Sequence, residues 1–285
     1  MLLLSVLFGL LSMLGFAFAN VTSQPLARKF GSTQVILLRT ATTAAVLFML
    51  SIPSLHNLKD VNYVIFTFLL GVVGYIPVLA FTHGVKISRV SIVSPIAGTS
   101  PLITVLLAFI ILNTPLKSLT WFAIILIVLA NVAASINPKS LKDSNILKLA
   151  SGVPFGLIAA MGWGTFFFAL VYSTRALGPW LAIFLAELGV ATTAGIHLLL
   201  SKQKVEFKQA LNPKIIGNGL AIVIGGVAFA VGVSHYNVGI VAALSNSVAL
   251  PSILLAAYLF KERLNLFEKL TSAIMILGVV ILSLG

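Results

Sequence analysis

The chain has 285 residues, of which 59% are hydrophobic and only 8% charged, and its formal net charge is +12. A soluble globular domain carries about 25% charged residues, so this composition excludes a soluble domain and indicates an integral membrane protein. The positive charges are spread thinly over short loops, which excludes a basic nucleic-acid-binding domain. The sequence contains no Cys, which excludes disulfides and thiolate metal sites.

Apolar stretches separated by charged residues or by Pro, Asn and Gly predict membrane-spanning helices. No Lys or Arg precedes the first stretch, so we expect it to be a retained helix and not a signal peptide. In chain order the predicted spans are residues 2–20, 33–52, 62–82, 90–112, 118–136, 152–173, 178–200, 215–235, 238–260 and 266–284. The expected fold is therefore an all-α integral membrane protein with ten transmembrane helices.

The sequence also contains an internal repeat. FGLLSMLGFAFA at residues 8–19 is echoed by FGLIAAMGWGTF at residues 155–166, and Arg28 and Gly31 match Arg175 and Gly178 at the same offset. We expect a first five-helix repeat at 1–137, a polar connecting loop at 138–150 and a second repeat at 151–285. Because five is odd, the second repeat must be inverted in the membrane. Inverted repeats are common in secondary transporters, with the binding site near mid-membrane.

The distribution of Lys and Arg predicts an orientation. Most of them fall in or next to loops 21–32, 83–89, 137–150, 201–214 and 261–265, whereas the other predicted loops hold only Lys59, Lys117 and Arg175. The positive-inside rule places the first group in the cytoplasm and both termini outside. We therefore expect a multi-pass protein of the cell membrane.

Glu187 is the one acidic residue that lies well inside a predicted span. A charge at a helix centre costs about 2.5–3.5 kcal/mol on insertion scales, so the side chain is expected to face a cavity or a partner. Arg39 occupies nearly the equivalent position in span 33–52. Glu187 is a candidate proton-coupling site or ligand for a substrate amine. The alternatives are a neutral, hydrogen-bonded Glu187, a structural ion pair between the two residues, and an Arg39 that extends to the interface.

Helix breakers recur in equivalent spans of the two halves, with Pro95 and Pro101 in span 90–112 and Pro251 in span 238–260. Pro77 breaks span 62–82 in the same way. Such breaks concentrate where backbone lines a cavity, although Gly and Pro are also generally common in membrane helices. We therefore predict a central cavity at these breaks.

The candidate substrate-binding residues are polar or aromatic side chains near these breaks and span ends. An aromatic plane can bind a cation, and a mid-span Asn needs a hydrogen-bond partner. The His residues have a simpler interpretation as interfacial polar groups. No metal-ligand spacing, nucleotide-binding motif or catalytic motif is found, so no metal, cofactor or enzymatic activity is predicted. The candidates are Trp163, Asn246, Ser245, Tyr75, Thr99, Ser94, His83 and His235.

The whole pattern resembles the EamA-type ten-helix branch of the drug/metabolite transporter superfamily. The resemblance rests on the repeated Phe-Gly opening with its later Gly-aromatic step, on Arg39, on SIVSPIAGTSPLITVLLAFIIL at 91–112 and on VAALSNSVALPSILLAAYLFKERL at 241–264. Glu262 fills the place where the family often has a Glu after the fourth span of a repeat, whereas the first repeat has Asn113 and Thr114.

The resemblance implies a secondary transporter that exports small metabolites, such as amino acids or related neutral, zwitterionic or amine solutes, by alternating access around a central cavity. A passive facilitator or channel is the alternative. The expected partners are the small-molecule substrate and the lipid bilayer, with protons as a candidate coupling ion and a monomer or homodimer as the assembly. The resemblance also implies that both termini are cytoplasmic, opposite to the charge-based orientation.

Overall fold

The computed structural model describes residues 2–88, 90–113, 117–135, 151–260 and 266–284, and this part of the chain is helical and contains no strand. The first half comprises α1 (Leu2–Phe30), α2 (Ser32–Ser51), the 3₁₀ helix η1 (Ile52–Lys59), α3 (Val61–Ile87), α4 (Val90–Ala97), α5 (Ser100–Leu112) and α6 (Ser118–Ser135). The second comprises α8 (Val153–Leu177), α9 (Pro179–Leu200), η3 (Phe207–Leu211), α10 (Pro213–His235), α11 (Val238–Asn246), α12 (Ala249–Phe260) and α13 (Leu266–Leu284).

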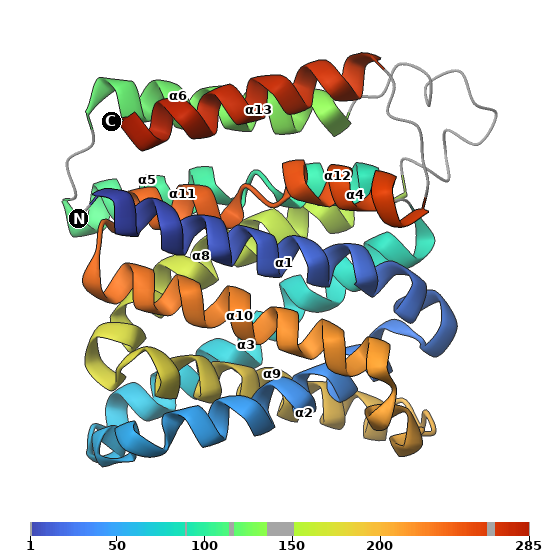
Figure 1. Ribbon diagram of the computed structural model, residues 1–285. Helices are drawn as coiled ribbons and strands as arrows, with labels where there is room; N and C mark the ends of the chain where they lie inside the picture. Colours follow the sequence, from blue (N-terminus) through green and yellow to red (C-terminus); the bar gives the residue numbers. More distant parts are fainter. Residues whose placement is uncertain (1, 89, 114–116, 136–150, 261–265, 285) are drawn as a thin grey trace.

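The helices lie roughly side by side along one direction (Figure 1). α2 packs on α9 at one edge of the bundle, and α6 packs on α13 at the opposite edge. Between these pairs, α1 packs on α10 and α3 packs on α8. Both ends of the chain lie at the same end of the bundle, where α1 begins and α13 ends (Figure 1).

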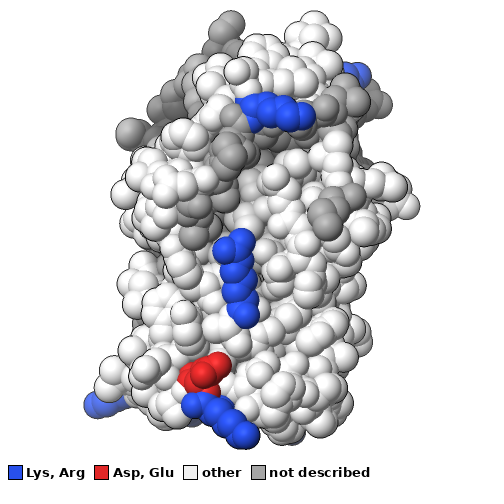
Figure 2. Space-filling view, turned by 90° about the vertical axis from the view of Figure 1, so that its left-hand side faces the viewer, with Lys and Arg blue, Asp and Glu red and all other residues white. Residues whose placement is uncertain are grey.

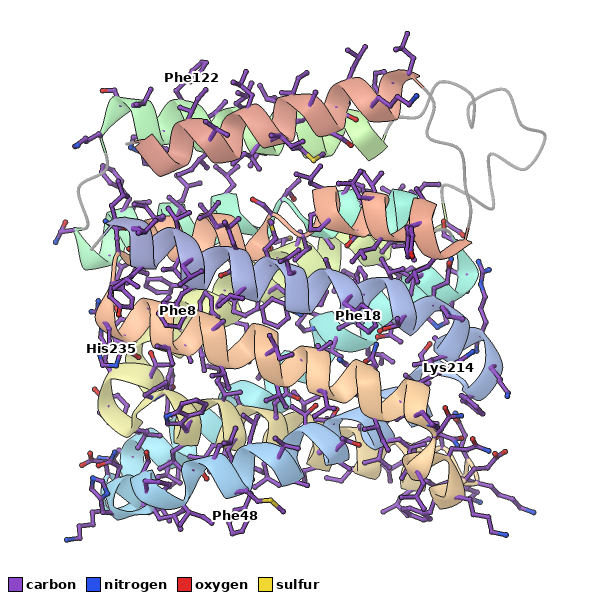
Figure 3. All side chains as sticks on the ribbon, in the orientation of Figure 1. Phe8, Phe18, Phe48, Phe122, Lys214 and His235 are labelled. Carbon is purple, nitrogen blue, oxygen red and sulfur yellow. The ribbon has the colours of Figure 1, made fainter. Side chains whose placement is uncertain are left out.

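Eight helical segments among the described residues are long and apolar enough to cross a membrane. The described parts of α6 and α13 add only the shorter apolar stretches Trp121–Ala130 and Lys269–Gly278. Apolar side chains point outward from the bundle, as Phe122 and Phe48 do at its two edges (Figure 3). An all-helical protein with an apolar outer surface is what a bilayer requires, because the backbone groups must be satisfied within each helix. The prediction of ten spans stays a prediction.

Two glycines with positive φ separate the first and second helices of each half. Gly31 (φ 88°) ends α1, and Gly178 (φ 81°) ends α8. Only glycine adopts this backbone readily, so a side chain here would be strained. The equivalent sharp turns explain why Gly31 and Gly178 match in the sequence repeat.

The predicted span 2–20 is too short, because α1 continues as a helix through Phe30. The polar side chains of its last turns form hydrogen bonds with the protein as well as being exposed to water. Gln24 Nε2 donates to the carbonyls of Val85 (3.3 Å) and Ser88 (3.2 Å), and Arg28 Nη2 donates to Ser88 O at 2.8 Å. Hydropathy marks the apolar part of a helix only, so this polar extension was predicted as a loop.

The two spans that were predicted to contain helix breaks are each divided in the structure. Span 90–112 forms α4 and α5 with a turn at Gly98 and Thr99, and span 238–260 forms α11 and α12 with a turn at Ser247 and Val248. A proline lies in the first turn of α5 and another near the start of α12, where the missing N–H is tolerated. The predicted loop at 138–150 lies outside the described residues.

Among the glycine contacts of the described residues, the closest helix–helix approach joins α3 to α9. A methyl group added to Gly71 would overlap the backbone carbonyl of Ala186, and one added to Gly189 would overlap the carbonyl of Phe68. Small residues allow membrane helices to approach to backbone contact, where dispersion and packing hold them together. This contact lies beside Glu187 and fixes its place relative to α3.

We predict that Gly71→Ala destabilises the protein by about 1–3 kcal/mol, because the added methyl group forces α3 and α9 apart. The matched control is Gly217→Ala in α10, where an added methyl group meets no atom within 4 Å. There the intrinsic preference of helices for Ala over Gly should leave stability unchanged or raised. Thermal unfolding in detergent measures both. Equal unfolding midpoints for the two variants would contradict this account of the contact.

Candidate functional site

A cavity lies in the middle of the bundle, where helices from both halves meet. Its volume is about 80 Å³, and since one water requires roughly 10–15 Å³ by this measure, it has room for several waters or a small solute. Its walls are formed by α1, α2, α3, α8, α9 and α10, by the facing ends of α4 and α5, and by Val248 between α11 and α12. The lining residues are Phe16, Asn20, Ser23, Arg39, Gly74, Val78, Phe81, Thr82, Ala97, Ser100, Trp163, Phe166, Phe167, Leu170, Ile183, Ala186, Glu187, Val190, Ile222, Gly226 and Val248.

One cationic and one acidic side chain line this cavity, Arg39 from α2 and Glu187 from α9. The two interact electrostatically, but no hydrogen bond or ion pair between them is found in the described structure. Arg39 is only 8% exposed, and its Nε has no hydrogen-bond partner within the described protein. Arg39 is therefore a buried residue of the cavity wall. The cavity holds opposite charges that keep hydrogen-bonding capacity for a third group.

Aromatic rings form much of the remaining wall. Trp163 from α8 lies 5.0 Å from Phe81 of α3, measured between ring centroids, and Phe16 of α1 lies 5.6 Å from Phe167. Phe166 and Phe167 are in edge contact at 5.5 Å. Packed rings at these distances support one another and present a rigid apolar surface. Phe16 and Trp163 are equivalent positions of the sequence repeat, so both halves contribute an aromatic side chain to the cavity.

Polar groups on α1 also line the cavity, and a side chain of α10 holds this part of α1 in place. Asn218 Nδ2 donates to Ala19 O and Thr22 Oγ1, both at 2.7 Å, and contacts Ser23 Oγ at 3.3 Å. Asn20 and Ser23 both line the cavity. Sequence reasoning did not select them, because they lie at the polar end of an apolar run. The Asn/Thr/Ser cluster that ends this run was the available signal.

The comparison with known protein families decides what this arrangement is. The model of the EamA-like transporter family matches residues 3–136 and again residues 150–284, which together are nearly the whole chain. The chain belongs to the EamA-like transporter family. The resemblance noted in the sequence is thereby confirmed, and with it membership of the drug/metabolite transporter superfamily. An EamA-like protein is a multi-pass membrane transporter that acts on a small-molecule substrate within the lipid bilayer.

Solved structures support the fold of this EamA-like protein. A structure titled "Crystal structure of protein" aligns with a TM-score of 0.70 over 96% of each chain, at 14% sequence identity. Identity this low shows a shared fold and nothing of the substrate. No curated protein matches the chain.

Among the predicted site residues of this EamA-like transporter, Trp163, Arg39 and Glu187 line the cavity. Tyr75 lies beside it on α3, and its hydroxyl forms a 2.6 Å hydrogen bond with His197 Nδ1. His83 packs on Phe155 with ring centroids 4.9 Å apart, and His235 packs against Tyr236 at the far end of α10. None of Tyr75, His83 and His235 is among the lining residues.

The remaining predicted residues lie at the helix breaks. Ser94 and Ser245 are buried, and their hydroxyls have no hydrogen-bond partner within the described protein. Thr99 Oγ1 donates to Ile96 O at 2.8 Å. The side chain of Asn246 lies outside the described part of the protein, and its backbone ends α11.

The predicted prolines lie inside or at the start of helices. Pro77 of α3 packs under Gly162 of α8. Pro95 lies in α4, Pro101 in the first turn of α5 and Pro251 in the first turn of α12. The described residues contain no group of three His, Asp or Glu side chains that could hold a metal ion.

We predict that a cysteine introduced at Ser23 reacts with a small water-soluble methanethiosulfonate, because this buried position opens onto the cavity. The matched control is Ser12→Cys, which lies on the same helix and is equally buried but does not line the cavity. The native chain contains no Cys that would interfere. Ser23→Cys should react about tenfold faster or more, since a buried thiol away from a cavity reacts only after local opening. Equal rates would contradict an accessible cavity.

Proposed function

We propose that this EamA-like protein is a secondary transporter that exports small metabolites through alternating access to the central cavity. The solutes proposed are neutral, zwitterionic or amine compounds such as amino acids. The observation that carries the proposal is the composition of the cavity, which combines one Arg, one Glu and a wall of aromatic rings at the meeting of the two family repeats. Phosphorylated metabolites would require several Arg or Lys side chains here.

The contacts between helices support an inverted repeat of two five-helix units. α1 packs on α10 as α8 packs on α3, while α2 packs on α9 and α6 on α13. This set of contacts is unchanged when each helix is replaced by its equivalent in the other half, that is, when α1, α2, α3 and α6 are exchanged with α8, α9, α10 and α13. α1 and α8 also run in opposite directions through the bundle (Figure 1). We propose the unit boundaries 1–137 and 151–285.

The same exchange relates individual close contacts. A methyl group on Gly84 would lie 3.0 Å from Phe155 Cβ and 3.1 Å from Val93, and one on Gly232 would lie 3.1 Å from Phe8 Cβ and 2.7 Å from Val241. Phe155 and Phe8 are equivalent positions of the sequence repeat. Matched contacts at opposite ends of the bundle give two interfaces of similar design, and a rocking motion can open one while it closes the other.

One pair of equivalent residues differs between the two ends, which supports two alternating states. Arg28 donates to Lys86 O at 3.3 Å and to Ser88 O at 2.8 Å, and so ties α1 to the turn after α3. Arg175, its counterpart in the last turn of α8, is exposed and makes no hydrogen bond with the described residues. We propose that this state is closed at the Arg28 end, and that Arg175 makes the equivalent contacts in the other state.

Counterflow in proteoliposomes tests the proposed function. Vesicles are loaded with an unlabelled solute, and uptake of the labelled form is measured for a zwitterionic, a neutral, an amine and a phosphorylated solute. We expect several-fold faster uptake of at least one of the first three when the solute is present inside, because alternating access accelerates exchange. A parallel series with a pH gradient tests protons as the coupling ion.

Uptake that is unaffected by internal solute would instead indicate a passive facilitator. Transport of the phosphorylated solute would contradict the substrate class.

We propose the orientation that the loop charges predict, with both termini outside the cell. Lys214 and His235 lie at the two ends of α10 (Figure 3). The end with Lys214, here called the basic end, also carries Arg28, Lys29, Lys86 and the Lys residues of 201–214. The opposite end is nearly uncharged, and its few basic residues interrupt a white surface (Figure 2). The positive-inside rule places the basic end in the cytoplasm.

Single cysteines test this orientation. Ser118 and Ser201 are exposed at opposite ends of the bundle. An impermeant thiol reagent added to intact cells should label Ser118→Cys, and it should label Ser201→Cys only after the membrane is permeabilised. Labelling of Ser201→Cys from outside would reverse the proposed orientation.

A further inference from the structure

We propose that Arg39 and Glu187 form a two-point clamp for a zwitterionic solute. The Arg39 guanidinium binds the carboxylate of the solute, and the Glu187 carboxylate binds its ammonium group. The apolar side chain of the solute lies against Trp163 and Phe81. This inference rests on the proposed transport function and names the substrate class that the cavity selects.

The first argument is that the two charges share a cavity without binding each other. Both line it, they interact electrostatically, and within the described structure no hydrogen bond joins them. A guanidinium has five N–H donors and a carboxylate about four acceptor sites. Arg39 lines the cavity and is 8% exposed, and its buried Nε has no hydrogen-bond partner within the described protein. A solute that carries both charges satisfies both ends at once.

The second argument is charge balance. Arg39 and Glu187 together contribute no net charge, and a zwitterion leaves the sum at zero. A monoanion pairs with Arg39 but leaves the charge of Glu187 buried without compensation. A monocation pairs with Glu187 and leaves the charge of Arg39 uncompensated in the same way. An uncompensated charge in a low-dielectric interior is costly. The cavity therefore rejects both singly charged analogues, which is selection against the wrong ligand as well as for the right one.

The third argument is that the clamp is held at a fixed spacing. Arg39 belongs to the first family repeat and Glu187 to the second, and α2 and α9 pack directly on each other. The backbone contact of Gly71 with Ala186 fixes the helix turn that carries Glu187. The Trp163 and Phe81 rings, 5.0 Å apart, form a rigid surface beside the charges. Preorganised groups lose little entropy when the solute binds.

A matched ligand series tests the clamp. Leucine is the zwitterion, 3-methylbutylamine lacks its carboxylate, and 4-methylpentanoate lacks its ammonium group, while all three share one apolar body. Binding to the detergent-solubilised full-length protein is measured by calorimetry. The wild type should bind leucine about 10- to 100-fold more tightly than either analogue, the range expected for one lost hydrogen bond to a charged group.

Two variants, each of which removes one of the two charges, should shift the binding preference from leucine toward one of the analogues. Glu187→Gln should weaken leucine binding by about 10- to 100-fold and improve the binding of 4-methylpentanoate. Arg39→Gln should weaken leucine binding similarly and improve the binding of 3-methylbutylamine. Lys59→Gln, which also removes one positive charge but at an exposed position outside the cavity, should change none of the three affinities. If Arg39 and Glu187 are a purely structural pair, both variants should bind all three ligands more weakly to the same degree, and that result would overturn the clamp.

A second measurement needs no substitution in the pair. Ser23→Cys opens onto the cavity, so a bound solute should protect it from the methanethiosulfonate. Leucine should protect it, and the two analogues at equal concentration should not. Equal protection by all three, or by none, would overturn the clamp.

The counterflow assay separates this outcome from failure of the transport function. If other solutes show counterflow but the protein does not prefer leucine over its analogues, the transport proposal is supported and the clamp is contradicted. If the protein binds leucine selectively but shows no counterflow, the transport proposal is contradicted and the clamp is supported.

Discussion

The contact between the backbones of α3 and α9 positions most of what surrounds the cavity. Gly71 and Gly189 allow the two helices to touch without intervening side chains. α3 then packs on α8, and α9 packs on α2, so helices of both halves are joined around this contact. In a membrane the hydrophobic effect does not drive helices together, and close packing of small residues supplies much of the attraction. Glu187 follows Ala186 in α9, so this contact also fixes the position of Glu187 relative to α3.

The electrostatics of the cavity follow from that packing. Two opposite charges that touch would neutralise each other and leave an inert ion pair. Arg39 and Glu187 both line the cavity, no hydrogen bond or ion pair joins them within the described structure, and the Arg39 Nε has no hydrogen-bond partner there. Such groups are costly to bury, and their cost is justified where they bind a solute. The aromatic rings around them form an apolar wall of low dielectric, which strengthens the charged interactions inside.

Much of this fold could be predicted from the sequence, because hydropathy and repetition report directly on helices in a membrane. The equivalent glycines at 31 and 178 mark equivalent turns, and the prolines of spans 90–112 and 238–260 mark helices that are divided. Hydropathy missed the polar last turns of α1, since their side chains are satisfied by carbonyls of distant helices. The same limit applies to the site. Arg39 and Glu187 stand out as charges in apolar spans, whereas the place of Asn20 and Ser23 at the cavity depends on the packing of α1 against α10, where Asn218 donates to Ala19 O.

The central claim is that two equivalent ends of one bundle open alternately onto this cavity. Distances between paired spin labels test it most directly, with one pair at Lys29 and Lys86 on the basic end and another at Arg175 and His235 on the opposite end. All four positions are exposed. The account predicts two populations at each end, with a longer distance at one end whenever the other is short, and a shift between them when a transported solute is added. Distances that stay single and unchanged at both ends, or that lengthen together, would contradict it.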